Sequence, residues 1–319
     1  MKTVIELYDA ENRRSEVMEK AGEILKSGGL VAFPTETVYG LGGDALNPEA
    51  SAKIYAAKGR PSDNPLIVHI ADMEALKVLA SEVPEKAKLL ADRFWPGPLT
   101  MIMPKSDAVP YATTGGLDTV AIRMPSHPTA YELIRSSGVY IAAPSANTSG
   151  RPSPTTAQHV YEDLNGRIDM IIDSGKVDIG LESTIVDLTG EIPTILRPKA
   201  PGMKYKHYAP KGDLVIVEGK KQAVAEMINY LTKMDAESGL KTAVIASDEN
   251  LSLYDADCRI NIGSREHEES IAANLYEVLR EMDELGIQKM YSESFAGGSL
   301  GAAIMNRLLK AAGHHVIRV

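Results

Sequence analysis

The chain has 319 residues, of which 44% are hydrophobic and 24% charged, values typical of a soluble globular protein long enough for two domains. Its formal net charge of −9 argues against a basic nucleic-acid-binding module, and no apolar run approaches the roughly 18 residues that a membrane span requires. A single cysteine, Cys258, excludes an internal disulfide framework and, with a start that lacks a signal-peptide pattern, predicts a cytoplasmic protein.

The N-terminal part, residues 1–198, predicts a strand-rich α/β domain. A helix is expected from Ser15 to Ser27, because Ser15 can cap it and the Gly28-Gly29 pair can end it. Pro48 marks a second helix start. Apolar spacing predicts further helices, and short apolar runs between turn residues predict strands. The expected helices are 72–80, 84–93, 128–137 and 155–163, and the expected strands are 30–33, 66–70, 99–103, 120–123, 140–143, 171–173, 184–187 and 194–197.

Residues 199–212 are expected to form an interdomain linker, because they are rich in proline and glycine and follow no period. Strands and helices then alternate over 213–319, which favours a smaller, parallel, Rossmann-like domain of three layers. No Gly-x-Gly-x-x-Gly follows its first strand, so dinucleotide binding there is unsupported. The expected strands are 214–218, 242–246, 258–262, 287–291 and 315–318, and the expected helices are 220–233, 266–285 and 300–312.

Four polar segments interrupt the apolar sequence of the N-terminal part where apolar runs end: 34–41, 57–65, 120–125 and 142–147. In the second of them, Lys58 and Arg60 are bracketed by Gly59 and Pro61, which predicts a shaped turn. Two cations held close together repel each other unless an anion lies between them, so we expect them to bind phosphate or carboxylate. A surface salt-bridge pair is the plainer alternative for this segment alone.

Several familiar chemistries lack their motifs in this chain. There is no P-loop, no His-Glu-x-x-His and no Gly-x-Ser-x-Gly, so we expect neither a metal site of the protein's own nor a nucleophile elbow. A concave basic pocket for a small anion can be built instead. Its neutral donors would be Ser145, Asn147, Ser153 and the run 182–184, and its cations Lys58, Arg60, Arg123 and Arg197. From the residues alone, the ligand is described only as carrying phosphate and carboxylate groups.

These segments resemble the YrdC-like family of threonylcarbamoyl-AMP synthases in its two-domain form. The resemblance covers 29–197 and reappears at 293–295 and 303–308; the motif at 201–210, Pro-Gly-Met-Lys-Tyr-Lys-His-Tyr-Ala-Pro, selects the two-domain type. It implies a twisted mixed-sheet α/β catalytic domain followed by the Rossmann-like domain. It also implies a nucleotidyltransferase that condenses L-threonine, bicarbonate and ATP, the last with Mg²⁺, into threonylcarbamoyl-adenylate and pyrophosphate. The product would pass to a separate threonylcarbamoyl transferase complex that modifies tRNA, so that tRNA is only an indirect partner.

The resemblance also implies roles for individual residues. L-Threonine would contact Thr37, with Thr35 as a nearby candidate, His69, Arg123, the backbone at Ala143, and Ser183. Lys58 and Arg60 would be catalytic and would contact ATP together with Asn64, Thr119, Ser145, Asn147, Ser153, Arg197 and Tyr208. The connection between Arg197 and Pro201 is shorter than is usual in the family, which bears on how far Tyr208 can reach.

Plainer roles stay open for some of these residues. His69 lies inside an apolar strand and could be a hydrogen-bonded core histidine, and Ser183 could simply begin a strand. Trp95 is expected to pack rather than to bind substrate. Two other functions also stay open: a module that binds structured RNA, and another carbamoyl- or acyl-adenylating enzyme on the same fold.

Overall fold

A computed structural model of the chain describes residues 2–9, 15–197, 208–295 and 297–319. The chain divides into two compact units, the first of residues 1–149, 153–178 and 182–200, the second of 150–152, 179–181 and 201–319. Residues 150–152 and 179–181 precede the linker in the sequence but belong to the second unit. One contact that holds the first of these segments is the hydrogen bond from Arg280 Nη2 to Pro152 O, at 2.5 Å. Most of the expected linker, including its motif up to residue 207, lies outside the described residues.

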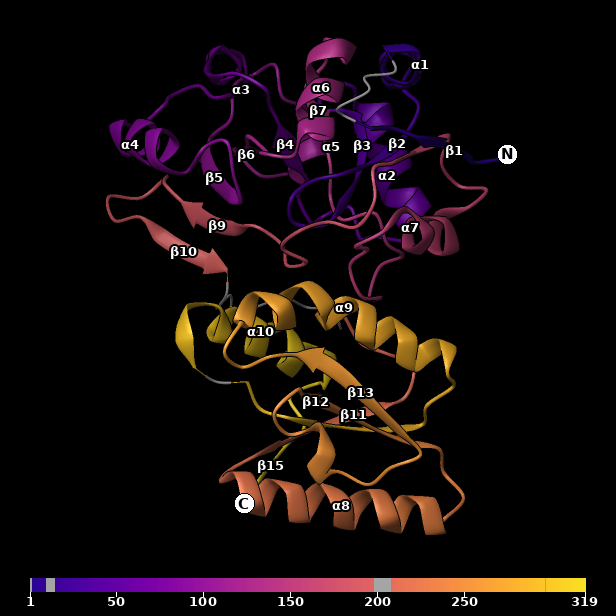
Figure 1. Cartoon of the computed structure of the whole chain (residues 1–319). Coiled ribbons are helices and arrows are strands. Elements are labelled where there is room, and N and C mark those ends of the chain that lie inside the picture. The colour runs from indigo at the N-terminus through magenta and orange to yellow at the C-terminus, as the bar shows by residue number, and fades with distance from the viewer. Residues whose placement is uncertain (1, 10–14, 198–207, 296) are drawn as a thin grey trace. The chain divides into compact units, whose positions relative to one another are not determined.

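The first unit is built on a ten-stranded sheet in the order β1-β8-β2-β3-β7-β4-β6-β5-β9-β10 (Figure 1). Parallel pairs such as β4 with β6 occur beside antiparallel pairs such as β5 with β6, so the expected mixed sheet is confirmed. Its strands are β1 (Val4–Leu7), β2 (Val31–Pro34), β3 (Tyr39–Asp44), β4 (Ile67–His69), β5 (Leu99–Pro104), β6 (Thr119–Arg123), β7 (Ile141–Ala142), β8 (Met170–Asp173), β9 (Thr184–Asp187) and β10 (Thr194–Arg197). Its helices are α1 (Ser15–Lys26), α2 (Pro48–Lys58), the 3₁₀ turn η1 (Met73–Ala75), α3 (Leu76–Leu79), α4 (Glu85–Phe94), α5 (Tyr111–Thr114), α6 (Pro128–Ser137) and α7 (Ala157–Leu164).

The central strands of this sheet are covered on both faces. All four residues of β2 are buried, and alternation sends Val31 and Phe33 to one face and Ala32 to the other. The first face packs on residues of α1 and α6, and the second on residues of α2 and α7. A strand buried on both sides reads as a continuous apolar run, which is why 30–33 was recognisable from the sequence.

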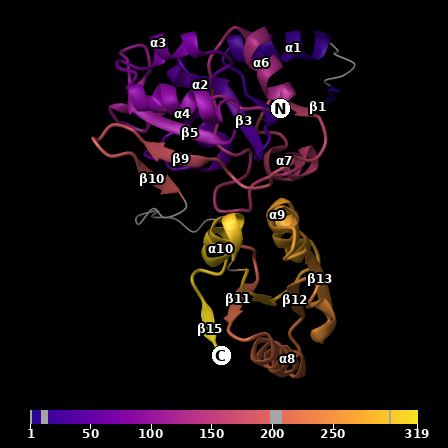
Figure 2. The same cartoon turned by 60° about the vertical axis from the view of Figure 1, so that its left-hand side comes forward.

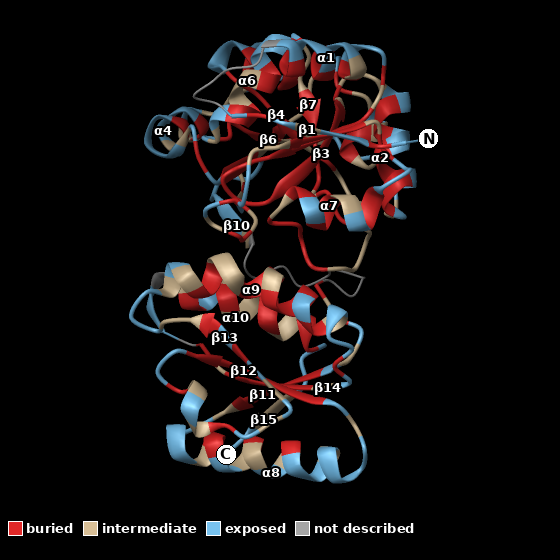
Figure 3. Ribbon diagram, turned by 45° about the vertical axis from the view of Figure 1, so that its right-hand side comes forward, coloured by how far each residue is buried: buried red, intermediate tan, exposed pale blue. Residues whose placement is uncertain are grey.

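The second unit has a five-stranded sheet in the order β13-β12-β14-β11-β15, in which every pair is parallel. Its elements are β11 (Asp213–Glu218), α8 (Lys221–Glu237), β12 (Thr242–Ser247), the 3₁₀ turn η2 (Leu251–Leu253), β13 (Cys258–Gly263), α9 (Glu268–Glu284), β14 (Lys289–Glu293), α10 (Gly298–Ala311) and β15 (Val316–Arg318). Helix α8 covers one face, and α9 and α10 cover the other (Figure 2). Figure 3 shows buried strands between helices whose outer sides are exposed. The expected Rossmann-like three-layer fold is confirmed.

Some elements were not expected from the sequence. Strand β3 begins inside the polar segment 34–41 and is rich in glycine, a residue that weakens a strand signal. A Cβ on Gly42 would lie 2.7 Å from Ile141 Cγ2 and 2.8 Å from Phe33 Cε1, so glycine is needed for close approach of the neighbouring strands. The helix expected over 72–80 is a 3₁₀ turn followed by a single α-turn. In the part of the chain that the structure describes, no helix is long and apolar enough to cross a membrane.

Candidate functional site

Neighbouring strands of the first unit align several of the residues expected to bind threonine. In the sheet register, His69 of β4 lies opposite Arg123 of β6, which lies opposite Thr100 of β5. Directly opposed residues share a face of the sheet, so these three side chains form one row. The row continues to Ser183, just before β9, whose Oγ lies 2.8 Å from Thr100 Oγ1. The sheet therefore brings together polar residues that are far apart in the sequence.

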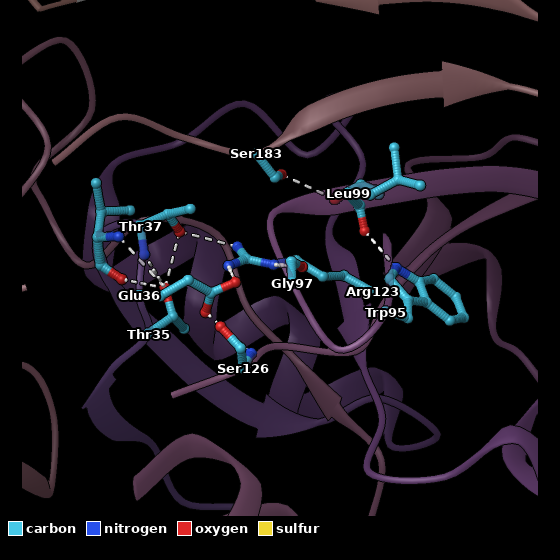
Figure 4. A network of polar contacts seen from close by, with 11 residues as sticks. Thr35, Glu36, Thr37, Trp95, Gly97, Leu99, Arg123, Ser126 and Ser183 are labelled. Atoms are coloured by element: carbon cyan, nitrogen blue, oxygen red, sulfur yellow. Dashed lines mark hydrogen bonds and ion pairs between the residues drawn. The ribbon is translucent and has the colours of Figure 1, made fainter. Parts of the chain in front are cut away.

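Arg123 is the centre of this cluster, and its guanidinium is held on three nitrogens (Figure 4). Nη1 donates to Thr37 Oγ1 at 2.9 Å, and Nε donates to Gly97 O at 3.3 Å. Nη2 lies 2.7 Å from Glu36 Oε1 in an ion pair whose side chains are 4% and 7% exposed. The other carboxylate oxygen of Glu36 accepts a hydrogen bond from the Ser126 backbone N–H at 3.2 Å. The cluster thus contains a buried acid that compensates the charge of Arg123.

The loop between β2 and β3 presents two hydroxyls to Arg123 in a fixed direction. Thr35 Oγ1 donates to Val38 O at 2.7 Å, so its single proton is used there. Thr37 Oγ1, 2.8 Å from Thr35 Oγ1, must then donate to Thr35 and accept from Arg123. Both threonines are buried. This chain of hydrogen bonds fixes the orientation of both expected threonine-binding hydroxyls.

His69 is a buried, neutral histidine. Burial and, to a smaller extent, the charge of Arg123 lower its pKa to about 3. Nδ1 lies 3.1 Å from Ile67 O, and because a carbonyl oxygen only accepts, this nitrogen carries the proton. The ring also meets Phe33 edge-on, with centroids 6.1 Å apart. These contacts match the core histidine that the sequence left open, and the register still places it in the row beside Arg123.

Lys58 joins the end of α2 to the Pro-Ser-Ala-Asn turn. Its side chain is buried, and Nζ donates to Ser145 O at 2.5 Å, to Asn147 O, and to Asn147 Oδ1 at 3.3 Å. Ser145 Oγ also donates to Asn147 Oδ1, at 2.5 Å, so Asn147 closes the turn. Just before the turn, the backbone N–H of Ala143 donates to Ile67 O at 2.8 Å. A contact between Ala143 and threonine would therefore use the carbonyl.

Arg60, Asn64 and Thr119 lie near the opposite strand ends from His69 and Arg123. Arg60 Nε donates to Asn64 O at 3.3 Å and Nη2 to Pro65 O at 3.2 Å, so this guanidinium shapes the loop before β4. Thr119 begins β6 and shares a face with Arg123 four residues later, which separates their Cα atoms by about 13 Å at ~3.3 Å per residue. These three expected nucleotide-binding residues therefore occupy a different level of the sheet from the expected threonine-binding row.

The remaining expected ATP contacts are distributed between the two units. Ser153, in the first unit, is buried and donates to Glu182 Oε1 at 2.6 Å. Arg197 ends β10, and its side chain lies outside the described residues. Tyr208 belongs to the second unit, where it adopts a left-handed backbone (φ 64°) and stacks on Tyr276 of α9 with centroids 5.0 Å apart.

Sequence reasoning missed three partners within this site: Glu36, Thr100 and the carbonyl of Gly97. A signal for Glu36 was present, because it is an acid between two threonines at the end of an apolar strand, where an unpaired charge would be costly. Thr100 and Gly97 gave no such signal, since their parts depend on sheet register and loop path. Among the described residues, no group of three or more His, Cys, Asp or Glu gathers as a metal site.

Two family models match the chain and together cover most of it. One, described as "Telomere recombination" and comprising the Sua5, YciO and YrdC proteins, matches residues 23–199. The other, described as "Threonylcarbamoyl-AMP synthase, C-terminal domain", matches residues 177–313. Curated relatives named threonylcarbamoyl-AMP synthase include one from Pyrococcus abyssi, 48% identical and covering 94% of this chain and 95% of the relative. Another, from Bacillus subtilis, is 46% identical and covers 98% of each chain.

Solved structures give the same relationship. The chain resembles P. abyssi Sua5 complexed with L-threonine at 46% identity and a TM-score of 0.90, covering 100% of this chain and 99% of that one. Escherichia coli YciO, 24% identical with a TM-score of 0.55, covers 64% of this chain and shares the fold. The two matched models, the near-complete relatives and the two folded units agree, and the chain therefore belongs to the Sua5 family of two-domain YrdC-like proteins.

Proposed function

We propose that this chain is a threonylcarbamoyl-AMP synthase, which converts L-threonine, bicarbonate and ATP into threonylcarbamoyl-adenylate and pyrophosphate. The observation that carries the proposal is the similarity to curated synthases of this name at 46–48% identity over nearly the whole chain. Both matched family models belong to this assignment, and one is itself described by the name of the enzyme. The described site offers a physical basis for binding threonine and ATP.

The row around Arg123 suits an amino acid. A guanidinium oriented by Thr37 and Gly97 can receive a carboxylate with little reorganisation, which favours binding of threonine at this point. The neutral ring of His69 and the hydroxyl of Ser183 lie in the same row and offer uncharged contacts for the rest of the substrate. Ala143 would add its backbone.

The turn held by Lys58 suits the nucleotide. The amine of bound threonine attacks bicarbonate to give a carbamate with loss of water, and a carbamate oxygen then attacks the α-phosphorus of ATP and displaces pyrophosphate. The transition state gathers negative charge on the phosphates, which Lys58 and Arg60 can stabilise. Asn64, Thr119, Ser145, Asn147 and Ser153, together with Arg197 and Tyr208, would hold the rest of ATP. Mg²⁺ would accompany the triphosphate and supply further charge neutralisation there.

The adenylate is a mixed anhydride of a carbamic and a phosphoric acid and is prone to hydrolysis. We therefore propose that it passes to a separate threonylcarbamoyl transferase that modifies tRNA, and that the protein works in the cytoplasm.

Pyrophosphate release provides the test. Purified chain supplied with ATP, Mg²⁺, bicarbonate and L-threonine should release pyrophosphate and form threonylcarbamoyl-adenylate, detected by mass spectrometry. Omitting threonine or bicarbonate should abolish both signals, and release that continues without threonine would contradict the proposal. Serine and alanine, tested in parallel, separate this reaction from another acyl or carbamoyl adenylation.

A further inference from the structure

Glu36 stands out as a charged group that the proposed roles leave unused. Its carboxylate is buried, and Oε2 accepts from the Ser126 backbone N–H. Oε1 lies 2.7 Å from Arg123 Nη2 in an ion pair, and 7% of the Glu36 side chain is exposed. A carboxylate offers about four lone pairs, and these two partners use two of them. The carboxylate can therefore accept a further hydrogen bond from a donor that arrives with a ligand.

We infer that Glu36 binds the α-amino group of the amino-acid substrate while Arg123 takes its carboxylate. The inference rests on the proposed function and adds a specificity-determining residue to it. An α-amino acid carries an ammonium and a carboxylate on one carbon, and Glu36 and Arg123 present a carboxylate and a guanidinium side by side. When the two pairs meet, each charge faces its opposite and the buried site stays neutral overall, which avoids the cost of an uncompensated buried charge.

The same contact also suits the chemistry of the nitrogen. The ammonium, the free amine and the carbamate nitrogen each carry at least one N–H, so each can donate to the Glu36 carboxylate. When an N–H of the free amine points at Glu36, its lone pair must point elsewhere, and the nitrogen is held in one orientation for attack on bicarbonate. Orientation of this kind is a recognised contribution to catalysis by bound reactants.

Two other roles for Glu36 predict different behaviour. If Glu36 only positions Arg123, its loss weakens every ligand that uses the guanidinium. If Glu36 competes with the substrate carboxylate for Arg123, its loss strengthens every such ligand. Only direct contact with the amino group makes the effect depend on whether the ligand has an amine.

The experiment is a cycle of two proteins and two ligands. Isothermal titration measures the affinity of the wild type and of Glu36→Gln, which keeps the side-chain size but removes the charge, for L-threonine and for 3-hydroxybutanoate, which lacks the amine. We expect the substitution to weaken threonine binding about 10- to 100-fold, the range of one charge-assisted hydrogen bond. Binding of 3-hydroxybutanoate should not weaken, because a ligand without an amine gains nothing from the Glu36 carboxylate. Glu49→Gln, at an exposed glutamate in the first turn of α2, serves as the matched control.

Equal weakening of both ligands, or tighter binding of both, would overturn the inference. Trp95 fluorescence in urea establishes that Glu36→Gln is folded; should it fail to fold, Glu36→Asp takes its place. The aspartate variant keeps the charge but shortens the reach, and it should weaken threonine alone, about threefold to tenfold; an unchanged threonine affinity would likewise overturn the inference. Failure of the proposed function is distinguishable, because it would appear as absence of threonine-dependent pyrophosphate release in the wild type.

Discussion

Lys58→Met tests how much of the first unit depends on one buried cation. Methionine has nearly the length of lysine but cannot donate, so the substitution removes the bonds from Nζ to Ser145 O, Asn147 O and Asn147 Oδ1. Each buried carbonyl left without its donor costs about 1–3 kcal/mol, or roughly 2–6 kcal/mol for the two backbone carbonyls. The variant no longer incurs the desolvation cost of the ammonium, which offsets part of that loss. We expect a net destabilisation of about 2–4 kcal/mol, large beside a total of roughly 5–15 kcal/mol.

The chain offers a selective probe for this measurement. Trp95 is the only tryptophan, and it belongs to the first unit, so its fluorescence during urea unfolding reports that unit. Lys77→Met provides the control, because Lys77 is 73% exposed and pairs with exposed Glu74, a contact whose loss should change stability by less than about 0.5 kcal/mol. If Lys58→Met also stays within 0.5 kcal/mol of the wild type, the contacts of Lys58 with the turn do not stabilise the fold as argued. The variant should in addition lower ATP affinity at least tenfold, with threonine affinity little changed.

Three further predictions follow from the same contacts. The pKa of His69 is about 3 in the folded chain and about 6.5 in the unfolded chain, so between these pH values only the unfolded chain binds this proton. The free energy of unfolding should therefore decrease as the pH is lowered, by about 2 kcal/mol between pH 7.5 and pH 5. In urea titrations followed by Trp95 fluorescence, His69→Gln should lose this component and exposed His267→Gln should keep it. Glu293→Leu should destabilise the second unit by about 3–5 kcal/mol, because buried Glu293 accepts from Ser247 N and Asn250 Nδ2 and pairs with Arg265. Urea unfolding followed by circular dichroism should then begin at a lower urea concentration than unfolding followed by Trp95 fluorescence. Coincident transitions at the wild-type urea concentration would contradict this. Binding of threonine at Arg123 should shift Trp95 emission, because both residues are hydrogen-bonded to the segment 97–99: Arg123 Nε donates to Gly97 O and Trp95 Nε1 donates to Leu99 O. An Arg123→Ala protein should show no such shift.

Much of the fold was accessible to sequence reasoning because its elements carry strong local signals. The parallel sheet of the second unit has buried strands separated by amphipathic helices, and its alternation alone predicted three layers. Likewise, Pro48 lies at the first helical position of α2, and Asn47 caps that helix, as local rules require. Strand β14 begins two residues later than expected, at Lys289, which lies opposite Thr242 in the pairing with β12.

The missed features depend on contacts between distant residues. Strand β1 has an exposed pattern on the edge of the sheet, and β3 is glycine-rich because its neighbours approach closely. Strand β3 thus lacks the apolar pattern that identifies a strand from sequence, and β1, although apolar, has only four residues. Similarly, the segment 120–125 identified Arg123, but only sheet register brings it beside Thr100 and His69, and only the fold brings it beside Glu36. Local sequence thus identified candidate side chains, while tertiary pairing determined which of them meet.

A crystal structure of the full chain with L-threonine and an ATP analogue bridged by methylene between its α- and β-phosphates would test the central claim most directly. We predict that the threonine carboxylate lies within hydrogen-bonding distance of Arg123 and that its amino nitrogen points toward the nucleotide's α-phosphate. The phosphates should lie beside Lys58 and Arg60. Threonine bound away from Arg123, or a nucleotide bound away from the turn that Lys58 holds, would contradict the account.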